Sequence, residues 1–320
     1  MFEIVVLSIV LGLWLAAFDL TLLAISGFLQ PRIIALPARV RATAIFVVRF
    51  TPLLLAGVVT LGVFLPAWWQ HEPEKTGEAL TLALIGAGLL AMAPVVEALR
   101  RGARMAARTQ ERLMVWRGRG QKSPLSAASA FDVVEVSGDD LALCVGGYFK
   151  PTIFASTTAT RSLNPREQRV ALAHETSHAV SRDPLRLLMM EACPDFLHLF
   201  SLDASWRHAF ASAAEFAADA RASRGDRGAA LDLASALVKV ARLGVASPAP
   251  SLSVASMMGE TAELQARVEA LATGPMDDGR VGRIPSAWGL VLVCLLICAL
   301  GTQTSETAQR FTEAIVALLG

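Results

Sequence analysis

The sequence has 320 residues, of which 54% are hydrophobic and only 18% are charged. This composition excludes an intrinsically disordered protein and a solvated coiled coil, because neither has so large an apolar fraction. The 29 Lys and Arg residues nearly balance the 28 Asp and Glu residues, so no net field attracts a polyanion and nucleic acid is not an expected partner. The four cysteines form no CxxC pair and are expected to be reduced packing residues.

Three apolar stretches precede the polar centre of the chain, at residues 4–29, 50–67 and 79–96, and a fourth follows it at 284–302. Each is close to or longer than the roughly 20 residues that cross a bilayer as a helix. The sequence therefore predicts three transmembrane helices within residues 1–99 and one more near the C-terminus. A cleaved signal peptide is the disfavoured alternative, because the first stretch lacks a basic start and is too long.

The basic residues between these stretches predict how the chain is oriented. Four arginines and no acid follow the first stretch, the loop after the second is net acidic, and eight basic residues follow the third. Because Lys and Arg are retained on the cytoplasmic side, the N-terminus and the tail at 303–320 are expected outside and the polar centre in the cytoplasm. Residues 100–129 are predicted to be a basic juxtamembrane linker in contact with anionic lipid, with an RNA-binding strip as the alternative.

Asp19 is the one ionisable residue inside the first apolar stretch. A carboxylate at that depth is costly, so its side chain is expected to face protein or water. One interpretation is a coupling or proton-sensitive residue. The favoured interpretation is a hydrogen bond to a neighbouring span, through Thr43, Thr51 or a backbone carbonyl.

A small sheet is predicted at the start of the polar centre. Residues 133–136, 142–145 and 152–156 are short apolar runs separated by segments rich in Gly, Asp and Ser, which is typical of strands and turns. The pattern then changes to a helical one. Asn164, Pro165 and Glu167 form the signature of a capping box with proline in the first helical turn.

The predicted helix after this cap carries His174, Glu175 and His178. Two histidines four residues apart lie on one helical face, where both imidazoles can reach a single tetrahedral cation. In the HExxH pattern the glutamate points to a metal-bound water and acts as general base. The pattern therefore predicts a zinc-dependent hydrolase, with a chance spacing of two packing histidines as the alternative.

Two more helices are expected downstream of this motif. One begins at Asp183 and Pro184 and is predicted to run to about Phe200, with a kink at Pro194. The other begins near Asp203.

The second of these helices supplies the predicted third ligand. Glu215 has mostly Ala and Phe neighbours, which indicates a buried face, and a catalytic zinc needs a third protein ligand. Asp219, one turn later, is predicted to accept a hydrogen bond from a ligand histidine. His208, seven residues before Glu215, is a candidate oxyanion stabiliser, and His198 and Tyr148 are weaker ones. For these last three residues a packing role is the favoured interpretation.

These motifs together resemble the integral-membrane gluzincin peptidases, most closely the BlaR/MecR antirepressor type, with the HtpX and CAAX-protease type as relatives. The resemblance rests on residues 174–178, on Arg182-Asp183-Pro184, on Glu215 with Asp219, and on the plan of membrane spans. It extends to residues 146–163, where that family has an edge strand, and to residues 263–268, which are similar to its late arginine-containing helix.

The resemblance implies a mostly α membrane protein in which an α+β gluzincin-like metallopeptidase domain, residues 130–275, is inserted between the third and fourth of four transmembrane helices. It implies one zinc ion per chain, a protein or peptide substrate cut at the cytoplasmic side, and a location in the bacterial plasma membrane. The sequence ends at Gly320, so the penicillin-binding sensor domain of BlaR/MecR proteins is expected to be absent. A stimulus is then expected through the spans, the tail, or a separate sensor or repressor protein.

The expected function is regulatory proteolysis by metal-activated water with Glu175 as general base. Three alternatives stay open at this point: a housekeeping protease that clears damaged membrane proteins, a non-catalytic transducer whose helices are braced by zinc, and an interaction scaffold with an accidental motif.

Overall fold

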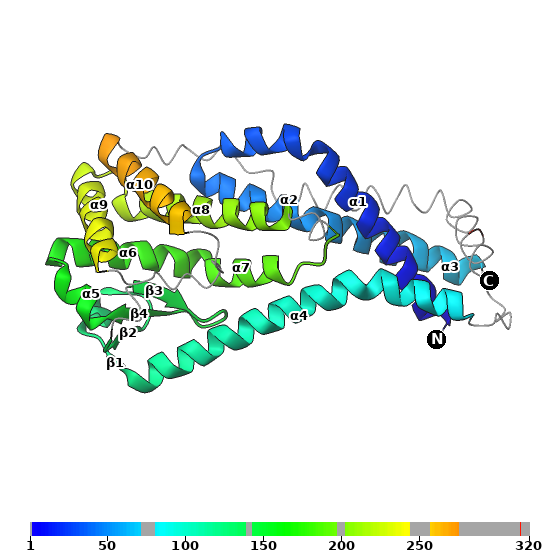
Figure 1. Cartoon of the computed structure of the whole chain (residues 1–320), viewed down its shortest axis with the longest axis horizontal. Helices are drawn as coiled ribbons and strands as arrows, with labels where there is room; N and C mark the ends of the chain where they lie inside the picture. Colours follow the sequence, from blue (N-terminus) through cyan, green and yellow to red (C-terminus); the bar gives the residue numbers. More distant parts are fainter. Residues whose placement is uncertain are drawn as a thin grey trace.

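The computed structural model describes residues 2–71, 81–138, 143–196, 202–243, 257–274 and 314. Long helices form one end of the molecule, and a small sheet with a group of shorter helices forms the other (Figure 1). The predicted fourth span at 284–302 lies outside the described residues.

Among the described residues, three helices are long and apolar enough to cross a membrane: Phe2–Ile34, Ala38–Trp69 and Leu82–Arg119. They coincide with the three predicted spans before the sheet, but each is longer than its apolar stretch. The second begins at Ala38 rather than at residue 50. The elements that make up these helices are α1 (Phe2–Ile34), α2 (Ala38–Val58), the π-helix η1 (Val59–Phe64), α3 (Leu65–His71) and α4 (Leu82–Arg119).

The basic stretch after the third span is mostly helical, because α4 continues without a break to Arg119. Figure 1 shows α4 running from the end that holds the N-terminus to the sheet. Leu113 and Trp116 are buried among the arginines and pack on the sheet, with the Trp116 ring 5.5 Å from that of Phe154. Leu113 and Trp116 are three residues apart and therefore lie on one apolar face of the helix. This face is hard to recognise in the sequence because many of the surrounding residues are charged.

The sheet has four strands in the order β1-β2-β4-β3. Its strands are β1 (Gly120–Lys122), β2 (Val133–Val136), β3 (Leu143–Gly146) and β4 (Thr152–Ser156). The three predicted strands are present to within one residue, and β1 is an addition. β4 pairs in parallel with β2 and antiparallel with β3, so the strand within residues 146–163 is internal and the expectation of an edge strand there is wrong. The described edge next to the helices is β3.

The part of the chain that the structure describes after the sheet contains six helices: α5 (Thr157–Ser162), α6 (Pro165–Ser181), α7 (Asp183–Glu191), α8 (Leu202–Ser223), α9 (Arg227–Arg242) and α10 (Met257–Thr273). The predicted capping box is confirmed: the Asn164 side chain accepts the Glu167 N–H at 3.0 Å, and the Glu167 carboxylate accepts the Asn164 N–H at 2.8 Å. The prediction that α7 reaches Phe200 is wrong. It ends at Glu191, because the residue before Pro194 is disfavoured in helical conformation and the proline ends the helix instead of kinking it.

Helix α6 lies at the centre of this end of the molecule. One of its faces packs on the sheet through Leu172 and Ala179, and another packs on α9 and α10 through Val170 and Ala173. Helix α8 lies beside α6 and packs in turn on α2, in an apolar cluster that also includes Ile33 of α1. The arrangement holds α6 and α8 next to each other between the sheet and α2.

The structure gives Asp19 a different partner from the predicted ones. Its Oδ2 atom accepts the backbone N–H of Phe196 at 2.8 Å. Thr43 and Thr51 donate instead to carbonyls of their own helix.

Candidate metal site

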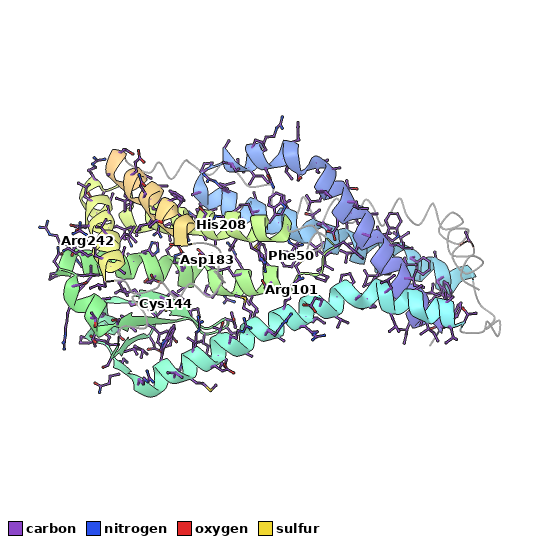
Figure 2. The ribbon with its side chains drawn as sticks, in the orientation of Figure 1. Phe50, Arg101, Cys144, Asp183, His208 and Arg242 are labelled. Carbon is purple, nitrogen blue, oxygen red and sulfur yellow. The ribbon has the colours of Figure 1, made fainter. Side chains whose placement is uncertain are left out.

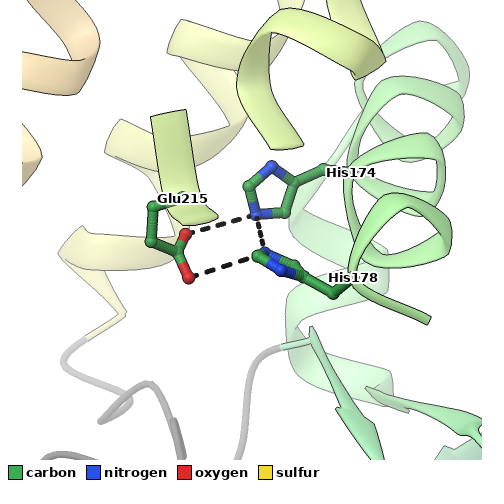
Figure 3. A group of neighbouring side chains, drawn as sticks. All are labelled: His174, His178 and Glu215. Atoms are coloured by element: carbon green, nitrogen blue, oxygen red, sulfur yellow. Dashed lines mark hydrogen bonds and ion pairs between the residues drawn. The ribbon is translucent and has the colours of Figure 1, made fainter. Parts of the chain in front are cut away.

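Helices α6 and α8 bring three predicted ligand side chains together. His174 and His178 project from one face of α6, and Glu215 projects toward them from α8 (Figure 3). Arg182 ends α6 in the left-handed conformation, with φ of 53°, and the chain turns there directly into α7. This turn places the Asp183 side chain next to the imidazole of His178.

The three side chains direct their donor atoms at one point. His174 Nε2 lies 3.1 Å from His178 Nε2 and 3.4 Å from Glu215 Oε2, and His178 Nε2 lies 3.5 Å from Glu215 Oε1. A tetrahedral zinc with ligand bonds of about 2.0–2.1 Å separates its ligand atoms by about 3.3 Å. The spacing and the His, His, Glu donor set therefore fit a zinc ion.

A carboxylate lies behind each of the two imidazoles. Asp219 Oδ1 is 2.9 Å from His174 Nδ1, and Asp183 Oδ2 is 2.8 Å from His178 Nδ1. Each carboxylate favours a proton on Nδ1 and leaves the Nε2 lone pair for a metal. Asp183 (labelled in Figure 2) was expected as the start of a helix and as part of the motif that carries the resemblance, but no role beside His178 was predicted for it; its place five residues after His178 was the available signal.

Arg267 of α10 completes the cluster. Its Nε and Nη2 atoms each donate to Asp219 at 2.7 Å, and its Nη1 lies 2.7 Å from Glu215 Oε2. One buried guanidinium thus holds the third candidate ligand and the partner of His174 at the same time. The resemblance drew attention to a late arginine-containing helix, but no role for Arg267 was predicted.

These neighbours shift the pKa values of the candidate ligands strongly. Burial alone would lower the pKa of His174, but Asp219 and Glu215 outweigh it and raise that pKa to about 10. Burial would raise the pKa of Glu215, yet Arg267 and the two histidines hold it well below its usual range. Metal ligation requires neutral imidazole, so a divalent cation would replace the proton on His174.

Glu175 is buried on the face of α6 that turns to the sheet. Burial raises the pKa of its carboxyl group, which brings it nearer the range of a useful general base. Burial and the Glu175 carboxylate together raise the pKa of the Cys144 thiol in β3. The candidate base thus lies close to the edge strand.

The candidate oxyanion stabilisers do not join this cluster in the described part of the chain. His208 is exposed on α8, about 10 Å along the helix axis from Glu215. Tyr148 is half-buried after β3, and His198 lies outside the described residues. The roles of these residues, like those of the ligands, Glu175 and Asp219, stay predictions.

Comparison with known proteins places the whole cluster inside one family domain. The sequence profile of peptidase family M48 matches residues 106–286, which is more than half of the chain and includes every candidate ligand. A search of curated proteins gave no match. The chain therefore belongs to peptidase family M48, a family of typically zinc-dependent metallopeptidases.

Proposed function

We propose that the protein is a membrane-anchored zinc endopeptidase whose metal is held by His174, His178 and Glu215. The observation that carries this proposal is the convergence of three donor atoms within 3.5 Å from two separate helices. A carboxylate behind each imidazole supports it further, since structural histidines do not need such partners.

The proposed reaction is hydrolysis of a peptide bond without a covalent intermediate. Bound zinc would polarise the scissile carbonyl and make water a nucleophile near neutral pH. Glu175 takes the proton of the attacking water and passes it to the leaving amine. Asp219 and Asp183 keep both imidazoles in the tautomer that ligates, and Arg267 fixes the carboxylate of Glu215.

The edge of the sheet supports an extended polypeptide as substrate. Among the described residues β3 pairs only with β4, so its other edge is available for a further strand. Cys144 of this strand is near Glu175, which would bring a peptide bond of the added strand close to the candidate base.

The finer parts of the proposal concern the membrane and the biological role. The charge distribution supports an N-terminus outside and a cytoplasmic site in a bacterial plasma membrane, with a fourth span at 284–302. Exposed arginines along the second half of α4 suit anionic lipid headgroups. The likeness of the plan to BlaR/MecR proteins favours a regulatory protease that cleaves a repressor or signalling protein over a housekeeping one.

The decisive experiment compares the wild type with Glu175→Gln in purified protein and in cells. The variant is expected to keep one zinc per chain by metal analysis and to lose proteolysis by about a thousandfold, because the base is gone while the ligands remain. Glu111→Gln, an exposed change on α4, is the control. Unchanged proteolysis in Glu175→Gln would remove this mechanism.

The same experiment separates the alternatives. A zinc-braced transducer binds zinc but shows no proteolysis in either form. A scaffold holds no stoichiometric zinc. Comparative proteomics of cells with the wild type and the variant then shows one stabilised protein for a regulatory protease and many for a housekeeping one.

A further inference from the structure

All three long helices make buried polar contacts with one short segment, residues 191–196. The contacting side chains are Asp19 of α1, Arg49 of α2 and Arg101 of α4, which are 0%, 1% and 7% exposed. We call this segment with these three side chains the 191–196 junction. It lies outside the metal site and begins at Glu191, the last residue of α7.

Arg49 forms the centre of the junction. Its guanidinium makes an ion pair with Asp195, and both side chains are fully buried. It also donates to the Cys193 Sγ and carbonyl oxygen, each at 3.5 Å. α2 therefore holds the segment through its side chains and its backbone together.

Arg101 holds the beginning of the segment from the opposite side. It donates to the carbonyl oxygens of Glu191 at 3.3 Å and of Cys193 at 3.2 Å. In Figure 2 its label lies between α4 and α7. The two helices approach so closely here that a Cβ atom on Gly102 would lie 2.6 Å from that of Ala192.

Asp19 holds the end of the segment. Its carboxylate accepts the N–H of Phe196 at 2.8 Å, across 177 positions of sequence. A backbone N–H that is partly removed from water is stabilised by an acceptor, and here a helix that is apolar enough to cross a membrane supplies it.

The segment is connected to both halves of the metal site. Before it, α7 begins at Asp183, which contacts His178. After it, α8 carries Glu215, and Arg207 of α8 forms an ion pair with Glu191. Helix α8 also packs on α2, in an apolar cluster that includes Ile33 of α1 and Ala214, the residue before Glu215.

We infer that the 191–196 junction couples the long helices to the metal site, with Asp19, Arg49 and Arg101 as positioning residues. The inference rests on the proposed function and adds a way in which the long helices control the geometry of the metal site. A buried ion pair costs more than apolar packing would, but it fixes one geometry. A shift of α1, α2 or α4 then moves α7 and α8 relative to α6, and the distance from Glu215 to the histidines changes with it.

The test uses Arg101→Gln and its neighbour Arg100→Gln in the full-length protein, loaded with cobalt in place of zinc. The visible spectrum of cobalt reports ligand geometry directly and needs no substrate. Arg101→Gln is expected to alter the spectrum at full cobalt stoichiometry. It is also expected to lower kcat on fluorescein-labelled casein by about tenfold or more with little change in KM. Arg100 is 71% exposed, and its variant is expected to match the wild type.

A second pair of variants tests the same inference if Arg101→Gln fails to fold. Asp19→Ala removes the acceptor of the Phe196 N–H, whereas Asp19→Asn keeps one. The alanine variant is expected to shift the cobalt spectrum and the asparagine variant to restore it. A site that is merely destabilised would lose cobalt in both variants.

The wild type alone provides a third measurement, because coupling is reciprocal. Added zinc is expected to slow hydrogen exchange of the peptide that contains Phe196 and to leave residues 120–128 unchanged. Unchanged exchange at Phe196 on zinc binding would overturn the inference, as would wild-type cobalt spectra in Arg101→Gln and Asp19→Ala. Absence of stoichiometric cobalt in the wild type would instead overturn the proposed function.

Discussion

The metal site and the 191–196 junction are both buried and charged, yet they differ in how their polar atoms are matched. In the junction Arg49 meets the opposite charge of Asp195, and one carboxylate oxygen of Asp19 accepts the Phe196 N–H. In the metal site two imidazole nitrogens and a carboxylate face one another at 3.1–3.5 Å. Such converging lone pairs need a proton or a cation between them. The difference distinguishes a candidate binding site from a structural cluster of similar composition.

The largest expected effect breaks the pairing in the junction. Arg49→Met removes the buried cation that forms an ion pair with Asp195 and is expected to lower the free energy of unfolding by about 3 kcal/mol or more. Adding Asp195→Leu is expected to restore most of the lost free energy of unfolding, because the double variant no longer buries the carboxylate that paired with Arg49. Denaturation of both variants in detergent is the measurement. Arg39→Gln, an exposed change on the same helix, is the control. Equal stability of the single and double variants would show that Arg49 and Asp195 do not compensate each other's charge.

A smaller effect is expected from the carboxylate behind His178. Asp183→Asn removes the charge that orients this imidazole and is expected to weaken zinc binding by about 10–100-fold, measured against a competing chelator. The fold is expected to persist, because the neutral amide keeps an oxygen next to Nδ1. If Asp183→Asn lowered the free energy of unfolding as much as Arg49→Met, the carboxylate would have the same structural role as the junction ion pair, and the contrast between the two regions would be wrong.

The smallest effect is the change in zinc affinity per unit of pH. The pKa of His174 is raised to about 10, so below that pH a metal must displace its proton, and the displacement becomes easier as pH rises. Zinc affinity is therefore expected to increase by about tenfold per pH unit between pH 7 and 9 for one released proton. Calorimetry in buffers of different ionisation enthalpy counts the protons. Affinity that is flat across this range would show that His174 is already neutral.

The sequence was sufficient for features that depend on neighbouring residues. The capping box at Asn164 and the strands around residues 133–156 follow from local turn chemistry and alternation, and the structure has them. The HExxH spacing places His174 and His178 on one face for the same local reason.

The sequence was insufficient where a residue's role depends on a distant partner. Arg267 lies 48 positions from Asp219, and Asp19 lies 177 positions from Phe196, so no local pattern indicates either contact. The end of α7 was misjudged because Pro194 is compatible with a kink or with a stop. Only the contacts of residues 191–196 with the long helices decide between them.

The unbroken course of α4 has a consequence for which substrates the enzyme can reach. A single helix of 38 residues, about 57 Å long, starts beside the N-terminus and ends at the sheet. Under the proposed function this helix sets the distance between the edge strand and the membrane surface. A target anchored in the same membrane would be cut only where its spacer spans that distance, so spacer length would select cleavage sites independently of their sequence.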